Sequence, residues 1–181
     1  LPASGHSMSM LRIPWVILNT IPDGPLTRDA RKLVELLTDK ARTATMLVTL
    51  AEEMPTNEAR DLSSSLHSEF GIDVDHVFIN QVYPNRFGVD SPQSAVLDAV
   101  LANNANADQP TGATSRVGAL ADLARHAALA RGRRRLNERY IAQLAKEIDC
   151  PQSQLPRLFV PTLTPRDVQT LSEMIEAQLT E

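Results

Sequence analysis

The sequence predicts an α/β fold in which a mostly parallel sheet is flanked by helices. Segments with apolar residues at helical spacing alternate along the chain with short runs of strand-forming residues. Alternation of this kind is typical of parallel sheets with helices on both faces. The length of 181 residues and the hydrophobic content of 43% suffice for one sizeable core. We therefore expect residues 1–181 to form one domain or part of one.

The first predicted elements are a helix, a strand and a second helix. Apolar residues recur at helical spacing over residues 26–41. Residues 46–50, Met-Leu-Val-Thr-Leu, form a short apolar run that is typical of a buried parallel strand. The next helix follows Pro55 and continues to Phe70, and Gly71 is well placed to end it in a left-handed conformation.

A second strand is predicted from Val74 to Ile79, ending at Asn80. Strand, helix and strand then form one unit with a right-handed crossover, so the two strands should pair in parallel. A helix is expected over residues 91–102, with a serine and a proline at its start. The polar residues 103–113 after it predict a mobile loop.

The last third of the chain predicts a long helical stretch, a strand and a final helix. The stretch covers residues 114–148, and Gly132 leaves open whether it is one helix or two packed helices. Residues 158–160, Leu-Phe-Val, are the third strand candidate. Thr164 and Asp167 have the spacing of a capping box that opens the final helix.

Charge and cysteine content exclude several classes of function. The net charge of -4 and the isoelectric point near 5.6 argue against nucleic acids and anionic membranes as partners. The single cysteine, Cys150, can form neither an internal disulfide nor a zinc cluster, which favours a cytoplasmic location. No apolar run approaches the roughly 20 residues of a membrane span. We expect no stable membrane insertion.

Three segments at predicted strand ends are the candidates for function: residues 49–55, 80–84 and 161–165. In a parallel sheet they converge at one edge, where ligands bind. Asn80 is the most specific candidate among them, because a carboxamide offers a donor and an acceptor and can pair with the edge of a purine. The alternative interpretation is a turn residue that ends a strand.

Five segments, in this order, resemble the arsenical-pump family of anion-transporting ATPases, which includes the ATPase that targets tail-anchored membrane proteins. They are residues 1–6, 24–26, 49–58, 80–84 and 161–168. The similarity extends over nearly the whole chain. It implies the C-terminal portion of a P-loop NTPase-like domain with a mostly parallel sheet.

The resemblance implies functional roles for two groups of positions. Pro2, Gly5 and His6 would belong to a nucleotide-sensing switch, with a turn glycine and a helix-start histidine as the alternative interpretations. In the family, the asparagine after the second strand reads adenine, and the loop after the last strand closes over the base. The corresponding positions are Asn80, Gln81, Pro161, Thr162 and Leu163.

One part of the closing loop departs from the family. The family's loop continues with a Glu-Val-Arg-Gly-like segment, whereas this chain reads Asp-Val-Gln-Thr over residues 167–170. The arginine and the glycine are missing. The details of base closure are therefore open, and a non-catalytic scaffold that has lost nucleotide turnover is a second hypothesis.

The sequence contains no phosphate-binding loop. None of its seven glycines lies in a GxxxxGK[ST] pattern or in the family's related glycine-rich version. Phosphoryl transfer depends on backbone amides, a lysine and magnesium that cradle the phosphates. We expect the loop upstream of Leu1, so that this chain is inactive alone.

By resemblance, the full protein would be a cytoplasmic ATPase. It would bind ATP and Mg²⁺ between the protomers of a homodimer and act on an unknown anionic or hydrophobic cargo. A third alternative is a flavodoxin-like domain that binds a small molecule, which would also have a parallel sheet.

Two further features have competing interpretations. The arginine-rich residues 131–135 either bind phosphate or form a solvated helix face, and we favour the solvated face. Met8 and Met10 either line a cargo groove or fill gaps in the core, and we favour the core.

Overall fold

The computed structural model describes residues 4–88, 92–105 and 116–179. Its three strands form one parallel sheet in the order β1-β2-β3. The predicted α/β class is confirmed. The elements are α1 (Ser4–Thr20), α2 (Pro25–Thr38), β1 (Met46–Leu50), α3 (Glu53–Phe70), β2 (His76–Val82), α4 (Pro92–Ala105), α5 (Arg116–Glu147), β3 (Gln152–Pro156) and α6 (Pro165–Leu179).

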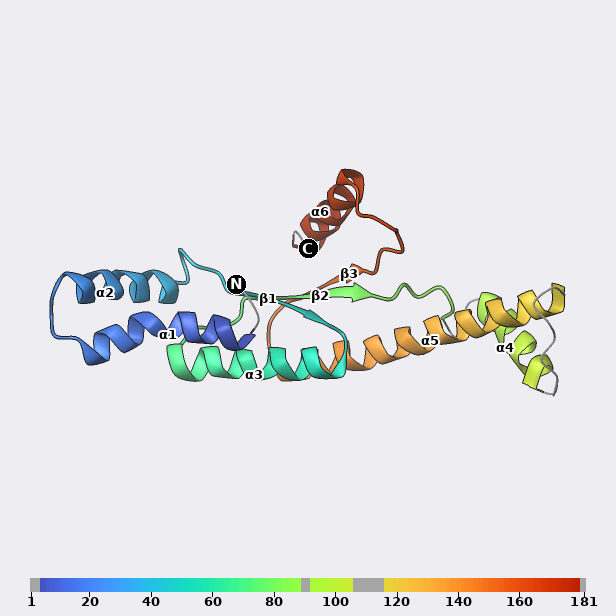
Figure 1. Cartoon of the computed structure of the whole chain (residues 1–181), viewed down its shortest axis with the longest axis horizontal. Coiled ribbons are helices and arrows are strands. Elements are labelled where there is room, and N and C mark those ends of the chain that lie inside the picture. Colours follow the sequence, from blue (N-terminus) through green and yellow to red (C-terminus); the bar gives the residue numbers. More distant parts are fainter. Residues whose placement is uncertain (1–3, 89–91, 106–115, 180–181) are drawn as a thin grey trace.

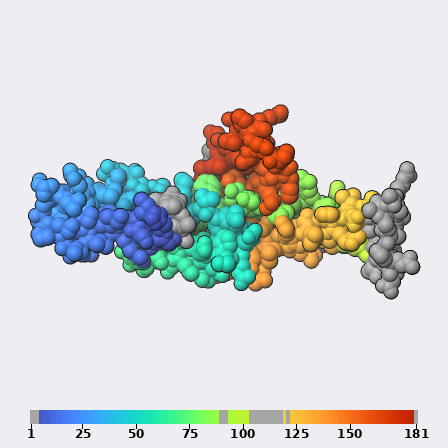
Figure 2. All heavy atoms as spheres, viewed as in Figure 1, coloured from blue at the N-terminus to red at the C-terminus, as the bar shows by residue number. Residues whose placement is uncertain are grey.

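The molecule is elongated, with the sheet near its middle (Figure 1). Helices α3 and α5 run along one face of the sheet, and α6 lies on the opposite side against β3. Helices α1 and α2 pack together at one end, whereas α4 packs on the far part of α5 at the other end. Figure 2 shows α6 as a ridge that stands above the body of the protein.

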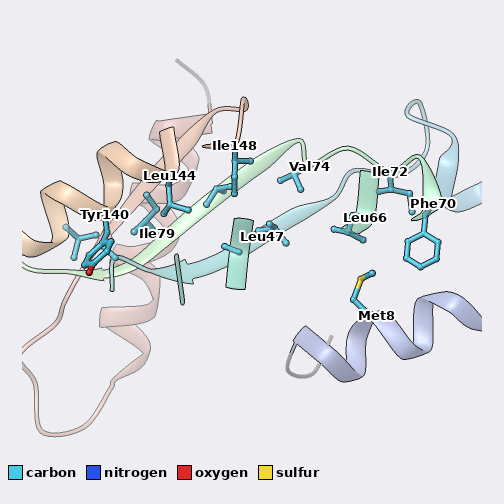
Figure 3. Close-up of a cluster of buried hydrophobic side chains, with 14 residues drawn as sticks. Met8, Leu47, Leu66, Phe70, Ile72, Val74, Ile79, Tyr140, Leu144 and Ile148 are labelled. Atoms are coloured by element: carbon cyan, nitrogen blue, oxygen red, sulfur yellow. The ribbon is translucent and has the colours of Figure 1, made fainter. Parts of the chain in front are cut away.

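The core lies between the sheet and the helices α3 and α5 (Figure 3). Val77 and Ile79 of β2 are completely buried, as is Leu144 of α5. Burial alternates along β1, where Leu47 and Thr49 are buried while Val48 is exposed. This alternation is expected of a strand covered on one face only.

Several elements begin and end where the sequence predicts. Strand β1 has the predicted bounds, residues 46–50. Gly71 ends α3 in the left-handed region at φ 67°, and its N–H donates to the carbonyl oxygen of His67 at 3.0 Å. At the start of α6, the Thr164 N–H donates to Asp167 Oδ2 at 2.9 Å, and the Asp167 N–H donates back to Thr164 Oγ1 at 3.4 Å. The predicted capping box is therefore present.

The predicted third strand at residues 158–160 is wrong. The chain instead pairs with β2 through the preceding residues, with Val77 opposite Gln152 and Phe78 opposite Ser153. The physical reason is pairing: Ser153 is 1% exposed and has a hydrogen-bond partner on β2, whereas Phe159 of the predicted run is 59% exposed. The polar strand β3 is held in place by hydrogen bonds, including one of 2.8 Å between His76 Nε2 and Ser153 Oγ.

The free edge of β3 is covered by a side chain of α6. The Gln154 N–H donates to Gln178 Oε1 at 2.8 Å, and Gln178 Nε2 donates to the Gln154 carbonyl oxygen at 3.2 Å. This carboxamide thus satisfies both backbone groups of one edge residue.

The helices differ from the predictions in three places. The sequence does not predict α1 as a 17-residue helix. Helix α5 is a single 32-residue helix that runs through Gly132, which is exposed and requires no break. Residues 103–105 belong to the last turn of α4, and the rest of the loop predicted to residue 113 lies outside the described residues.

Two properties predicted from composition can be compared with the structure. None of the helices, as far as the structure describes them, combines the length and the apolar character needed to cross a membrane. Cys150 is half-buried beside the core, and burial, together with Asp149 and Asp75, raises the pKa of its thiol. At neutral pH this cysteine is therefore a thiol rather than a reactive thiolate.

Candidate functional site

The candidate site is the edge of the sheet at which all three strands end. Strands β1, β2 and β3 end at Leu50, Val82 and Pro156, and because they are parallel these ends share one edge. Open parallel sheets bind ligands beyond this edge. The structure therefore brings the chain segments that follow the strands to the place where the sequence argument expects a ligand.

Asn137 of α5 joins the segments that follow β1 and β2. Its Nδ2 donates to the Ala51 carbonyl oxygen at 2.9 Å, and its Oδ1 accepts from the Tyr83 N–H at 2.8 Å. The side chain is 6% exposed. One buried carboxamide thus fixes two backbone segments at the edge.

Sequence reasoning missed Asn137. The available signal is its spacing, because it lies three residues before Tyr140 and seven before Leu144, on the face of α5 that faces the core. An asparagine on the apolar face of a helix requires hydrogen-bond partners, and here both partners come from backbone at the site.

Asn80 lies within β2 and does not follow it, which corrects the predicted strand end. It is opposite Leu50, the last residue of β1, and it is half-buried. Its Oδ1 accepts a hydrogen bond from the Gln81 N–H at 2.8 Å, whereas its Nδ2 makes no hydrogen bond to the described residues. The carboxamide is held by its oxygen, and its two N–H donors remain for a ligand.

Gln81 has an unusual backbone conformation. Its φ of 56° lies in the left-handed region, which residues other than glycine seldom adopt. The pairing of β2 with β3 is irregular between Ile79 and Val82, around this residue. Gln81 Oε1 accepts a hydrogen bond from Arg157 Nη1 at 3.3 Å. The irregular segment therefore contacts the chain that leaves β3.

Pro161, Thr162 and Leu163 are exposed in the connection between β3 and α6. This connection reaches the site edge through its first residues. The Arg157 N–H donates to the Val82 carbonyl oxygen at 2.8 Å, and the ring of Phe159 meets that of Tyr83 edge-on at 5.8 Å between centroids. The three predicted base-closing residues follow this contact.

The predicted switch residues lie at the start of α1. Gly5 and His6 are exposed in its first turn, and Pro2 lies outside the described residues. Helix α1 packs against α2 and α3. Met8 is 8% exposed within the core, as favoured, whereas Met10 is 46% exposed.

The interpretation of residues 131–135 as a solvated face holds for the exposed Arg133 and Arg135 but not for Arg131 and Arg134, which are partly buried. Arg131 forms an ion pair with Asp98 at 2.7 Å and thereby joins α5 to α4. Arg133 donates to the hydroxyl group of Tyr83, and Arg134 donates to the Tyr83 carbonyl oxygen at 3.1 Å. These side chains hold α5 against its neighbours.

The described residues contain no group of three or more histidine, cysteine or acidic side chains that could hold a metal ion. Hydrogen-bond donors lie near this edge. They are the carboxamide of Asn80 and the guanidinium groups of Arg133, Arg134 and Arg157. Such a set is suited to ligands rich in acceptor oxygen and nitrogen atoms.

The fold defines a parallel α/β protein, a class whose members bind ligands beyond the carboxyl ends of the strands. Residues 25–96 match the model of the family described as anion-transporting ATPase. The match runs from α2 into α4 and includes Asn80. Over these residues the chain is similar to this ATPase family, and the predicted resemblance is confirmed there. No curated protein matches the chain.

Proposed function

We propose that this chain supplies the adenine-contacting part of an ATPase of the anion-transporting family. The observation that carries the proposal is the family match over β1, α3 and β2, together with the position of Asn80 at the ligand-binding edge. The free Nδ2 group of Asn80 supports a contact with an adenine ring nitrogen. Gln81 and residues 161–163 complete the proposed contact to the base.

The phosphates and Mg²⁺ are held elsewhere in this proposal. The sequence contains no phosphate-binding loop, and the described residues contain no metal-ligand cluster. The chain's own contribution is to orient the base, whereas a glycine-rich loop outside these 181 residues would cradle the phosphates with Mg²⁺. Hydrolysis then requires both parts, and the chain alone is inactive.

An uncovered part of the sheet supports association with further protein surface. The side chains of Met46 and Val48 on β1 are 52% and 71% exposed, and β1 is an edge strand with β2 as its neighbour. Exposed apolar side chains on an edge strand are typical of surfaces that another protein element covers. A cytoplasmic homodimer that acts on an anionic or hydrophobic cargo is the assembly we propose.

The first test is ATP hydrolysis by the complete gene product beside this chain at equal concentration. Turnover by the complete product alone is the expected result, because positioning of the phosphates supplies most of the catalysis. Turnover by the 181-residue chain would refute the requirement for a separate loop. Absence of both turnover and nucleotide binding in the complete product would favour the scaffold alternative.

The role of Asn80 is tested by Asn80→Ala in the complete gene product. We expect the affinity for ADP to fall by about 5- to 150-fold, which corresponds to roughly 1–3 kcal/mol for polar partners left unmatched. Calorimetry measures this change. Asn19→Ala is the matched control, because Asn19 is exposed on α1. Equal affinity in Asn80→Ala and the natural protein would remove the adenine contact from the proposal.

A further inference from the structure

Three arginines and two aromatic rings gather where β2 and β3 end, and we call them the arginine–aromatic cluster. The guanidinium carbons of Arg133 and Arg157 lie 5.4 and 5.3 Å from the centroid of the Tyr83 ring. Those of Arg157 and Arg86 lie 5.9 and 5.8 Å from the centroid of the Phe159 ring. The cluster thus combines the segments after both strands with α5.

The positive charge of this cluster is not neutralised within the described residues. No ion pair with a described carboxylate is formed by Arg86, Arg133 or Arg157. In contrast, the neighbouring Arg131 and Arg134 pair with Asp98 and Glu138. Three like charges gathered in a protein of net charge -4 repel one another, and an anion placed among them would remove that repulsion.

The geometry leaves the guanidinium groups able to bind. A guanidinium group has five N–H donors, and Arg133 and Arg157 each donate one hydrogen bond within this region, to the Tyr83 hydroxyl group and to Gln81 Oε1, so further donors remain for a ligand. Arg86, Arg133 and Phe159 are exposed, so a ligand can reach them. Tyr83 is 9% exposed, and Asn137 holds its backbone, so the ring that Arg133 and Arg157 contact is fixed in place.

We propose that the arginine–aromatic cluster binds an oxyanion of the phosphate type, either free or as the phosphate group of a small ligand. Several guanidinium groups suit a doubly charged tetrahedral oxyanion, because planar N–H pairs bind its oxygens in bidentate fashion. The site is separate from the adenine contact proposed at Asn80 and does not depend on it. Arg157 borders both sites through its hydrogen bond to Gln81.

The test is a titration of the 181-residue chain with inorganic phosphate at constant ionic strength, followed by NMR of the Tyr83 and Phe159 signals. We expect saturable shifts in the natural chain and an affinity about tenfold or more lower in Arg157→Gln and in Arg133→Gln. Arg135→Gln is the matched control, because Arg135 is exposed on α5 and lies outside the cluster. Its affinity should equal that of the natural chain.

A charge-preserving variant and a folding control complete the test. Arg157→Lys preserves the charge but not the planar donors, so it should bind phosphate more weakly than the natural chain and more tightly than Arg157→Gln. Circular dichroism confirms that the variants remain folded. An absence of saturation in the natural chain, or equal weakening by Arg135→Gln, would overturn the proposal.

AMP and adenosine distinguish the two sources of the phosphate group. If AMP binds at the cluster much more tightly than phosphate while adenosine does not, the ligand is a phosphate ester. If AMP and inorganic phosphate bind equally, the ligand is the free oxyanion. Either result supports the site, whereas adenosine binding that Arg133→Gln weakens as strongly as AMP binding would contradict it, because Arg133 does not contact Gln81.

Discussion

Replacing Leu144 with alanine should lower the free energy of unfolding of the 181-residue chain by about 2–5 kcal/mol. Leu144 lies in α5 and is 0% exposed. It belongs to the cluster that joins α5 to the central strand, with Ile79 also completely buried there (Figure 3). Truncation removes apolar burial and leaves a cavity between two elements that cannot fully close.

Urea denaturation of the two proteins measures this change. Leu129→Ala is the matched control, because Leu129 lies on the same helix and is 65% exposed. The control should change stability by less than about 0.5 kcal/mol. Equal losses in the two variants would show that Leu144 is not packed as the structure describes.

The second large effect is expected for Asn137→Ala, which should destabilise the chain by about 2–4 kcal/mol. The substitution leaves the Tyr83 N–H and the Ala51 carbonyl oxygen without their buried partner. Each buried polar group that loses its hydrogen bond costs roughly 1–3 kcal/mol. The effect should be local as well, because both groups lie at the candidate ligand-binding edge.

Amide hydrogen exchange separates this local effect from a general loss of stability. The Tyr83 amide should exchange much faster in Asn137→Ala, whereas the amide of Ile79 in the centre of β2 should change only with global stability. Asn19→Ala, at an exposed position on α1, is the control. Unchanged protection of Tyr83 would exclude Asn137 as its hydrogen-bond acceptor.

The elements that the sequence predicts well are those in which local and tertiary requirements agree. Strand β1 is a short apolar run with a buried face, and α3 ends at Gly71, whose left-handed conformation suits glycine. The capping box of Thr164 and Asp167 depends on residues three positions apart. Such features require no knowledge of distant residues.

Strand β3 could not be predicted in the same way. Its residues are mostly polar, whereas the apolar residues 158–160 that follow it look more like a strand. What selects the polar run is its partner, because Ser153 bonds His76 and Gln154 bonds Gln178, and both partners are distant in sequence. An edge strand of this kind is determined by its pairing with distant residues. The strand propensity of its own residues does not predict that pairing.

The residues of the candidate site also divide into those that the sequence predicts and those that it does not. The strand-end argument places Asn80 and Gln81 near the edge where the parallel strands end, because that argument follows from parallel topology alone. Asn137 and the composition of the arginine–aromatic cluster were not predicted, since they combine segments from β2, α5 and the chain after β3, although phosphate binding by residues 131–135 was the alternative interpretation. The pairing of β2 with β3 and the packing of α5 bring these residues together.

The carboxamide of Gln178 determines in which direction this sheet can grow. It occupies the backbone donor and acceptor of Gln154 as a neighbouring strand would, so an added strand beside β3 would first have to displace it. Among the described side chains, none pairs with the outer edge of β1 in this manner. A larger sheet built on this chain would therefore extend from β1, beside the exposed side chains of Met46 and Val48.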